Sequence, residues 1–216
     1  MSATLAVSGS NLCGDAPFSV ALCVGGEVLV SSVPAGARGD LAVLCRDVCA
    51  SRSVSPAELD RVVVDLGPGS YTGLRVAVTF VRLLAQFSSL KVEGVCSLAA
   101  LSRHAAVGDG VRSRPLLDAR RGRWHTALHE HVGEVTRELE PARAAAASDV
   151  LARVAPDEVL VAPVGLAAQL EADHGLRCTA ATGWSAAALL ADGLPRFEAE
   201  LHELEPRYLM ASYAED

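Results

Sequence analysis

The sequence is short of lysine and of aromatic residues: Lys91 is its only lysine, and aromatic residues make up 4% of the chain. Acidic residues outnumber basic ones, 26 to 19, which gives a net charge of −7 and an isoelectric point near 5.4. A protein that holds nucleic acid through a broad basic face needs the opposite balance. The charge therefore argues against that class and leaves room only for a local basic patch.

None of the six cysteines forms a C-x-x-C pair, and most of them sit among apolar residues. A zinc site normally needs closely spaced cysteines, and a disulfide framework is typical of small secreted chains. The pattern therefore favours buried free thiols over a disulfide framework or a zinc site.

No apolar run approaches the ~20 residues of a membrane-spanning helix, and the first seven residues carry no cationic side chain. A secretory signal peptide needs such a charged start. We therefore expect a soluble, cytoplasmic protein. Half of the 216 residues are hydrophobic, which suffices for one large core or two modest ones.

Recognisable catalytic motifs are also missing. The chain has no G-x-S-x-G elbow and no H-E-x-x-H metalloprotease motif. His125 and His129 have the H-x-x-x-H spacing that can bind a metal from one face of a helix, but their segment follows a turn and is better interpreted as a strand. We favour a solvated strand face, and we expect no metal site and no cofactor.

Apolar patterning predicts a first half with a mixed sheet and helices on its faces. An opening meander is expected from strands at 4–8, 18–24 and 27–33, with two glycines in the second turn. Further strands are expected at 61–66 and 91–95, and helices at 40–52, 55–58, 73–87 and 97–106.

A stretch of glycine and charge at 107–110 is the expected domain boundary. It divides the chain into domains 1–107 and 108–216. In the second domain we expect strands at 114–118, 124–130, 134–139 and 158–161, and helices at 148–154, 164–174 and 185–191. No internal sequence repeat is evident.

The most informative stretch is G-P-G-S-Y-T-G-L-R at residues 67–75, which follows a β-branched run and precedes a helical pattern. It predicts a strand, a tight turn and a helix. Such a turn can bind phosphate, but the P-loop ending and the G-x-G-x-x-G spacing are both absent, and the proline removes one N–H donor. We interpret the stretch as a structural corner formed by Gly67, Pro68, Gly69, Ser70, Thr72 and Gly73.

In the helix that follows, the polar side chains form one narrow stripe and apolar residues cover most of the rest. The stripe consists of Arg75, Thr79, Arg82 and Gln86. A helix on a sheet needs an apolar arc of only about 100°, so this helix has more apolar surface than one sheet covers. Either neighbouring helices of the same domain or a partner protein cover the excess.

Arginines cluster locally in this acidic chain. Most arginines on a turn are simply solvated, but a group of them could also contact phosphates, in an interaction that salt weakens. The cluster consists of Arg112, Arg114, Arg120, Arg121 and Arg123. The candidates for RNA contact are Arg120, Arg121 and Arg123.

Four segments carry a resemblance to a known family. Residues 63–75 are similar to a G-P-G-S-F/Y-T-G-L-R signature, residues 117–122 to a D-A-R-R-G hairpin, residues 97–101 to S-S-L-E-A-L and residues 206–209 to a closing P-x-Y-L-R. These motifs and their order resemble the TsaB (YeaZ) family. Its members are bacterial partners in making the threonylcarbamoyladenosine base of tRNA.

The resemblance implies an α/β fold of two RNase H-like domains of the actin and heat-shock ATPase superfamily type, with the second domain reduced. It implies a non-catalytic subunit that pairs with the TsaD protein through helices of the first domain, in an assembly that recruits the ATPase TsaE and that could contact tRNA indirectly. Family members also form homodimers through the same surface. The implied partner surface comprises Tyr71, Leu74, Arg75, Val78, Val81, Arg82, Leu84 and Ala85, with Leu41 and Leu44 on the preceding helix.

Three positions depart from the family pattern. The opening I-D-T-S is V-S-G-S at residues 7–10, the R-H-S-E segment is R-G-D-L at residues 38–41, and the terminal arginine is Met210. Ser8 therefore replaces the aspartate that ATPases of this superfamily place near metal and phosphates, which weakens any claim to nucleotide hydrolysis. The alternative is an active nucleotide-dependent enzyme, an ATPase or a kinase, that uses Asp65 and residues 67–70 around a phosphate.

Overall fold

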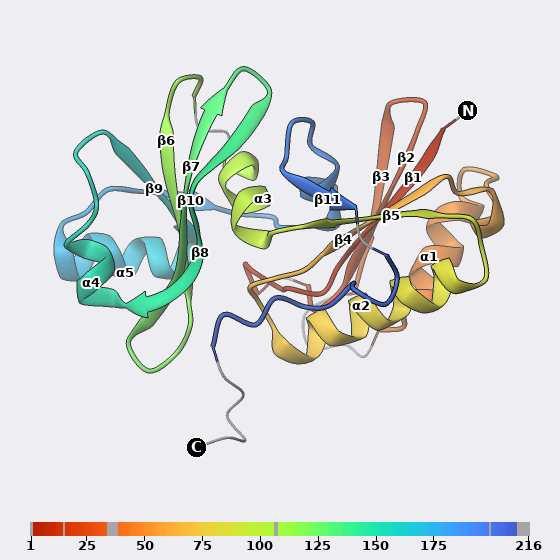
Figure 1. Cartoon of the computed structure of the whole chain (residues 1–216), viewed down its shortest axis with the longest axis horizontal. Coiled ribbons are helices and arrows are strands. Elements are labelled where there is room, and N and C mark those ends of the chain that lie inside the picture. The colour runs from red at the N-terminus through yellow and green to blue at the C-terminus, as the bar shows by residue number, and fades with distance from the viewer. Residues whose placement is uncertain (1, 15, 34–38, 106–107, 199, 211–216) are drawn as a thin grey trace.

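Two mixed β-sheets, each flanked by helices, lie side by side along the long axis of the computed structural model (Figure 1). The structure describes residues 2–14, 16–33, 39–105, 108–198 and 200–210. Arg38 and the predicted boundary residue Val107 lie outside these ranges. The prediction of an α/β fold with two mixed sheets is confirmed.

The first sheet has the strand order β11-β5-β4-β1-β2-β3. Its strands are β1 (Ala3–Ser8), β2 (Ser19–Val24), β3 (Glu27–Ser32), β4 (Arg61–Asp65), β5 (Lys91–Val95) and β11 (Arg196–Glu198). The first three form the predicted antiparallel meander, whereas β1, β4 and β5 run parallel. The three valines of β4 suit this central position, because β-branched side chains pack well in a strand that is buried on both faces.

The second sheet repeats this plan. Its order is β10-β9-β6-β7-β8, with β6 (Arg112–Asp118), β7 (Arg123–Val132), β8 (Val135–Ala146), β9 (Glu158–Pro163) and β10 (Cys178–Ala181). Again the first three strands form an antiparallel meander and the last two run parallel to the first. Order and direction therefore match those of β5-β4-β1-β2-β3.

The helices follow the same duplicated plan. The third strand of each half leads to α1 (Leu41–Ala50) or α4 (Ala147–Leu151), and the fourth and fifth strands are joined by α2 (Tyr71–Gln86) or α5 (Val164–His174). α4 and α5 have 5 and 11 residues, whereas α1 and α2 have 10 and 16. The second half is therefore the smaller copy.

One face of the first sheet is covered by α1 and α2 (Figure 1). The core on this face contains Cys45 and Cys49 of α1. These two thiols and Cys96 are buried and free, as predicted, whereas Cys23 and Cys178 are only partly buried.

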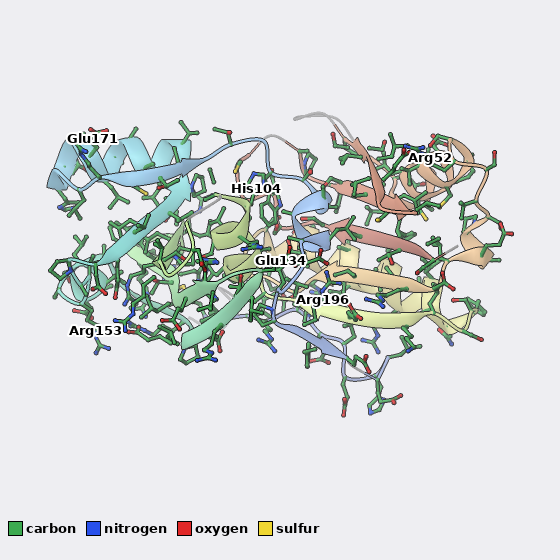
Figure 2. All side chains as sticks on the ribbon, turned by 90° about the horizontal axis from the view of Figure 1, so that it is seen from above. Arg52, His104, Glu134, Arg153, Glu171 and Arg196 are labelled. Atoms are coloured by element: carbon green, nitrogen blue, oxygen red, sulfur yellow. The ribbon has the colours of Figure 1, made fainter. Side chains whose placement is uncertain are left out.

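The other face of the first sheet is turned toward the second sheet, with α3 (Ser97–His104) and the short 3-10 helix η2 (Ala186–Leu190) between them (Figure 1). One hydrophobic cluster joins Ala6 and Val63 of the first sheet to Leu117 and Val161 of the second. His104, labelled near the centre of Figure 2, donates a hydrogen bond from Nε2 to the Thr182 carbonyl at 2.7 Å. The two sheets therefore share part of their core.

The C-terminal segment returns to the first sheet. β11 pairs with β5, Leu204 is fully buried in the core beneath α2, and the Arg207 N–H donates to the Leu66 carbonyl at 2.7 Å. By these contacts the C-terminal segment, residues 196–198 and 200–208, packs with the first sheet, although in the sequence it falls within the predicted second domain, 108–216. Such short pieces carry no periodicity of their own, so long-range packing decides where they lie.

Arg114 is completely buried, unlike the turn arginines with which it clusters in sequence. Its guanidinium donates to both carboxylate oxygens of Glu158, at 2.6 and 2.9 Å, and to both of Glu140, at 3.0 and 3.2 Å. The hydrogen bond from Arg114 lowers the pKa of Glu140. Arg114 therefore holds β6, β8 and β9 together and is not available to a phosphate.

Two of the three histidines of β7 are buried, which makes the predicted solvated strand face wrong for them. His129 is 0% and His131 1% exposed, whereas His125 is only partly buried. Ser113 Oγ lies 2.7 Å from His131 Nε2 and donates to Ser102 Oγ at 2.9 Å, and Ser102 Oγ lies 3.4 Å from His129 Nδ1. Among the described residues, no three His, Cys, Asp or Glu side chains could hold a metal ion.

We expect the folded state to lose stability as the pH falls from about 6.5 toward 4. Burial, with a smaller effect of His131, lowers the pKa of His129 to about 4, and burial also lowers the pKa of His131. In the unfolded chain both histidines take up protons near pH 6.5, so acid favours that state. Urea unfolding at pH 7 and pH 5 measures the effect, and His129→Asn should shrink the difference. An equal pH dependence in both proteins would contradict this assignment.

Candidate partner-binding surface

The strand-to-helix corner after β4 is built around the buried carboxylate of Asp65. Asp65 is 0% exposed. It accepts hydrogen bonds from Ser8 Oγ at 3.0 Å, from the Gly67 N–H at 3.0 Å and from Ser97 Oγ. Burial raises the pKa of Asp65, although these hydrogen bonds oppose the rise. Asp65 thus ties together the ends of β1 and β4 and the start of α3.

Glycines allow the backbone segments of this corner to touch. Gly67 has a φ of +97°, which other residues rarely adopt. A Cβ on Gly9 would lie 2.2 Å from the Gly73 carbonyl oxygen, and one on Gly69 would lie 2.6 Å from the Ser10 Cβ. Ser70 caps α2, because its Oγ accepts a hydrogen bond from the Gly73 N–H at 3.2 Å. Glycine therefore occupies the positions of this corner where the backbone leaves no room for a side chain.

The chain itself fills the crevice at the carboxyl ends of β1, β4 and β5. In open α/β sheets this is the usual place for a ligand. Here the Trp184 indole, 5% exposed, donates to Ser8 Oγ at 3.2 Å, and the Ser97 N–H donates to the Gly67 carbonyl at 2.9 Å. Asp65 and Gly67, which the alternative nucleotide-dependent enzyme would use around a phosphate, are therefore hydrogen-bonded to other residues of the chain itself.

Asp65→Ala is expected to destabilise the protein by about 2–4 kcal/mol, because it leaves buried donors on Ser8, Ser97 and Gly67 without their acceptor. Chemical denaturation measures the loss. Asp47→Ala, at an exposed site on α1, is the matched control and should change the free energy of unfolding by less than about 0.5 kcal/mol. Equal stability of both variants would show that Asp65 does not organise the corner.

Half of the residues predicted to form the partner surface are buried inside the protein. Leu74, Val78, Val81, Ala85 and Leu41 are each at most 4% exposed. With so little of their side chains exposed, they offer almost no surface to another protein. Part of the wide apolar surface of α2 is thus explained by other elements of the same chain. Leu44 and Leu84 are half-buried at the edge of this core.

The remaining predicted residues of α2 are exposed. Tyr71 is 46% exposed, and Arg75 and Arg82 also face outward. Three apolar residues that the sequence does not single out share this side: Val76 at 43%, Leu83 at 53% and, just after the helix, Phe87 at 83%. Their position beside the polar stripe is the signal that could have identified them. We call the exposed residues Tyr71, Arg75, Val76, Thr79, Arg82, Leu83 and Phe87 the α2 face.

The three arginines predicted to contact RNA lie at the turn between β6 and β7. Arg120 and Arg121 are exposed and have φ values of +68° and +52°. Arg120 lies 3.9 Å from Asp118, and Arg123 donates to the Ala144 carbonyl at 2.9 Å. The Asp118 carboxylate also accepts a hydrogen bond from the Arg120 N–H at 2.7 Å, which fixes the turn. The turn thus displays Arg120 and Arg121 on the second sheet.

Fold and site together define a duplicated α/β protein whose strand-end crevice is closed by its own chain and whose α2 face is open. Residues 38–193 match the family described as TsaD: tRNA N6-adenosine threonylcarbamoyltransferase. The chain belongs to this family and, within it, to the TsaB/YeaZ group.

Individual relatives agree with this placement. The chain is 36% identical over 88 residues to the tRNA threonylcarbamoyladenosine biosynthesis protein TsaB of Bacillus subtilis (strain 168), a match that covers 41% of this chain and 38% of that protein. YeaZ from Pseudomonas aeruginosa is 25% identical, with a TM-score of 0.77 over 97% of this chain and all of that one. A second Pseudomonas aeruginosa structure, described as an uncharacterized protein with similarity to peptidase YEAZ, has the same fold at 24% identity and the same TM-score.

None of the helices in the described residues is both long and apolar enough to span a membrane.

Proposed function

We propose that this chain is a non-catalytic subunit that pairs with a TsaD-type protein in the synthesis of N6-threonylcarbamoyladenosine in tRNA. The observation that carries the proposal is that the crevice at the strand ends is closed while the α2 face is exposed. Asp65 and Ser8 are bonded within the chain, so a nucleotide has no access to them, whereas the α2 face exposes large apolar side chains. Exposed apolar patches of this kind typically mark protein interfaces.

The fold supports the finer assignment to two RNase H-like domains of the actin and heat-shock ATPase type. Apart from β11 at the edge of the first sheet, both sheets have the same strand order and the same helix positions, with the second copy reduced. In this proposal the cytoplasmic assembly also recruits the ATPase TsaE, as the family resemblance implies. Contact of tRNA with Arg120, Arg121 and Arg123 is part of the same proposal.

Co-expression with the TsaD-type protein of the same organism, followed by size-exclusion chromatography, tests the pairing. The two proteins are expected to elute together. Separate elution under several salt and nucleotide conditions would refute the proposal.

The alternative, a nucleotide-dependent enzyme, makes the opposite prediction in calorimetry. Titration of the isolated chain with ATP and magnesium is expected to give no tight binding and no turnover, because Ser8 replaces an aspartate and Asp65 is buried. Tight binding with turnover would favour the enzyme.

A further inference from the structure

A groove runs between α2 and the C-terminal segment, with a volume of about 380 Å³. One wall is the outer side of α2, and the other is formed by Pro206 and Tyr208. The Tyr71 and Tyr208 rings meet at 4.7 Å between centroids and join the two walls at one end. The C-terminal segment is held in place independently of any partner, because Leu204 is buried and the Arg207 N–H is bonded to Leu66.

The groove is a positively charged region in an acidic protein. No Asp or Glu occurs between Leu66 and Val92, and among the described residues that line the groove Glu205 is the one acidic residue. Arg75 and Arg82 line the same groove, so its described lining carries a net charge of +1, whereas the whole chain carries −7.

The two arginines are available to a ligand in different ways. Arg75 is pre-positioned, because its Nη1 donates to Tyr71 Oη at 3.3 Å and its guanidinium lies 5.6 Å from the centroid of that ring. Arg82 makes no ion pair and no hydrogen bond to any residue that the structure describes. A guanidinium on an otherwise apolar surface binds a carboxylate well, because its fork of N–H groups matches the two oxygens.

A second copy of this chain is a poor occupant. In a two-fold symmetric dimer the same patch lies on both sides of the interface. The α2 face would then bring Arg75 and Arg82 of one copy toward those of the other, with no carboxylate on either helix and only Glu205 beside each pair of arginines among the described lining residues. Such like-charge contacts disfavour the wrong partner.

From this charge and shape we infer that the groove receives a carboxylate side chain from a partner helix that is otherwise apolar. The carboxylate pairs with Arg82 and Arg75, and the flanking apolar side chains pack on Tyr208, Val76 and Leu83. The inference rests on the proposed pairing with a TsaD-type protein and specifies the chemistry by which that protein is recognised. It also makes the heterodimer more stable than a homodimer through the same face.

The test is the affinity of Arg82→Glu for the TsaD-type protein of the same organism, measured by calorimetry at low and at physiological salt. Arg153→Glu, at the outer end of the second half (Figure 2), is the control because it makes the same change of charge far from the groove. Kd is expected to rise about tenfold or more for Arg82→Glu, and to stay within about twofold for the control. The wild-type Kd should rise with salt.

The possible failures are distinguishable. If the wild-type chain binds and Arg82→Glu binds equally well, the inference is wrong and the proposed pairing stands. If the wild-type chain does not bind at all, both fall. If sedimentation shows a wild-type homodimer that Arg82→Glu dissociates, the groove receives a second copy and the inference is also overturned.

Discussion

A Leu83→Glu variant is expected to fold like the wild-type protein and to lose at least about tenfold in affinity for the TsaD-type partner. Leu83 is 53% exposed on the α2 face, so a glutamate there stays solvated in the free protein. In the complex the same carboxylate would be buried in an apolar contact, where an unpaired charge is costly. Circular dichroism and calorimetry measure the two effects separately.

Val81→Glu is the matched comparison, two residues away on the same helix. Val81 is 0% exposed and packs in the core under α2, so the glutamate would place an uncompensated charge there and should prevent stable folding. A folded Val81→Glu protein would contradict the described burial. Full binding by Leu83→Glu would show that the α2 face is not the partner surface.

The second large effect is expected at Arg114. Arg114→Met should destabilise the protein by about 3–5 kcal/mol, because it leaves the carboxylate of Glu158, whose side chain is 4% exposed, without its counter-charge. Denaturant unfolding at pH 7 measures the loss. Arg112→Met removes a partly exposed ion pair with Asp157 at 3.5 Å and should cost less than about 1 kcal/mol.

A double variant separates charge from packing at this site. Adding Glu158→Leu to Arg114→Met removes the buried unpaired carboxylate and should restore part of the stability. If the double variant is less stable than Arg114→Met alone, packing of the arginine rather than its charge is what matters.

Local chemistry predicted the first half of the chain well. The V-V-V run of β4 and the two glycines between β2 and β3 each depend on neighbouring residues only, and each lies where the pattern places it. The same holds for β5 and α5, whose bounds match the predicted ranges.

Longer-range contacts explain what the sequence did not reveal. β11 has three residues, Arg196, Phe197 and Glu198, and becomes a strand only because β5 offers a free edge. The duplication is invisible as a sequence repeat, since it lies in the order of strands and helices rather than in matching residues.

The sequence predicted only part of the α2 face, again because long-range contacts decide the rest. The stripe of Arg75, Thr79 and Arg82 correctly marks the exposed side of α2. Which apolar residues of the helix are also exposed depends on the other segments that cover it. Leu204, more than a hundred residues away in the sequence, lies in the same hydrophobic core as Val81. Without knowledge of that core, Val81 and Leu83 cannot be told apart.

The central claim, that the α2 face and the adjoining groove bind the partner, is tested most directly by hydrogen–deuterium exchange of the chain alone and with its TsaD-type partner. We expect partner-dependent protection of residues 71–87 and 205–208, and unchanged exchange in the exposed edge strand β8. Protection confined to other surfaces, with α2 and the C-terminal segment unchanged in a saturated complex, would contradict the account.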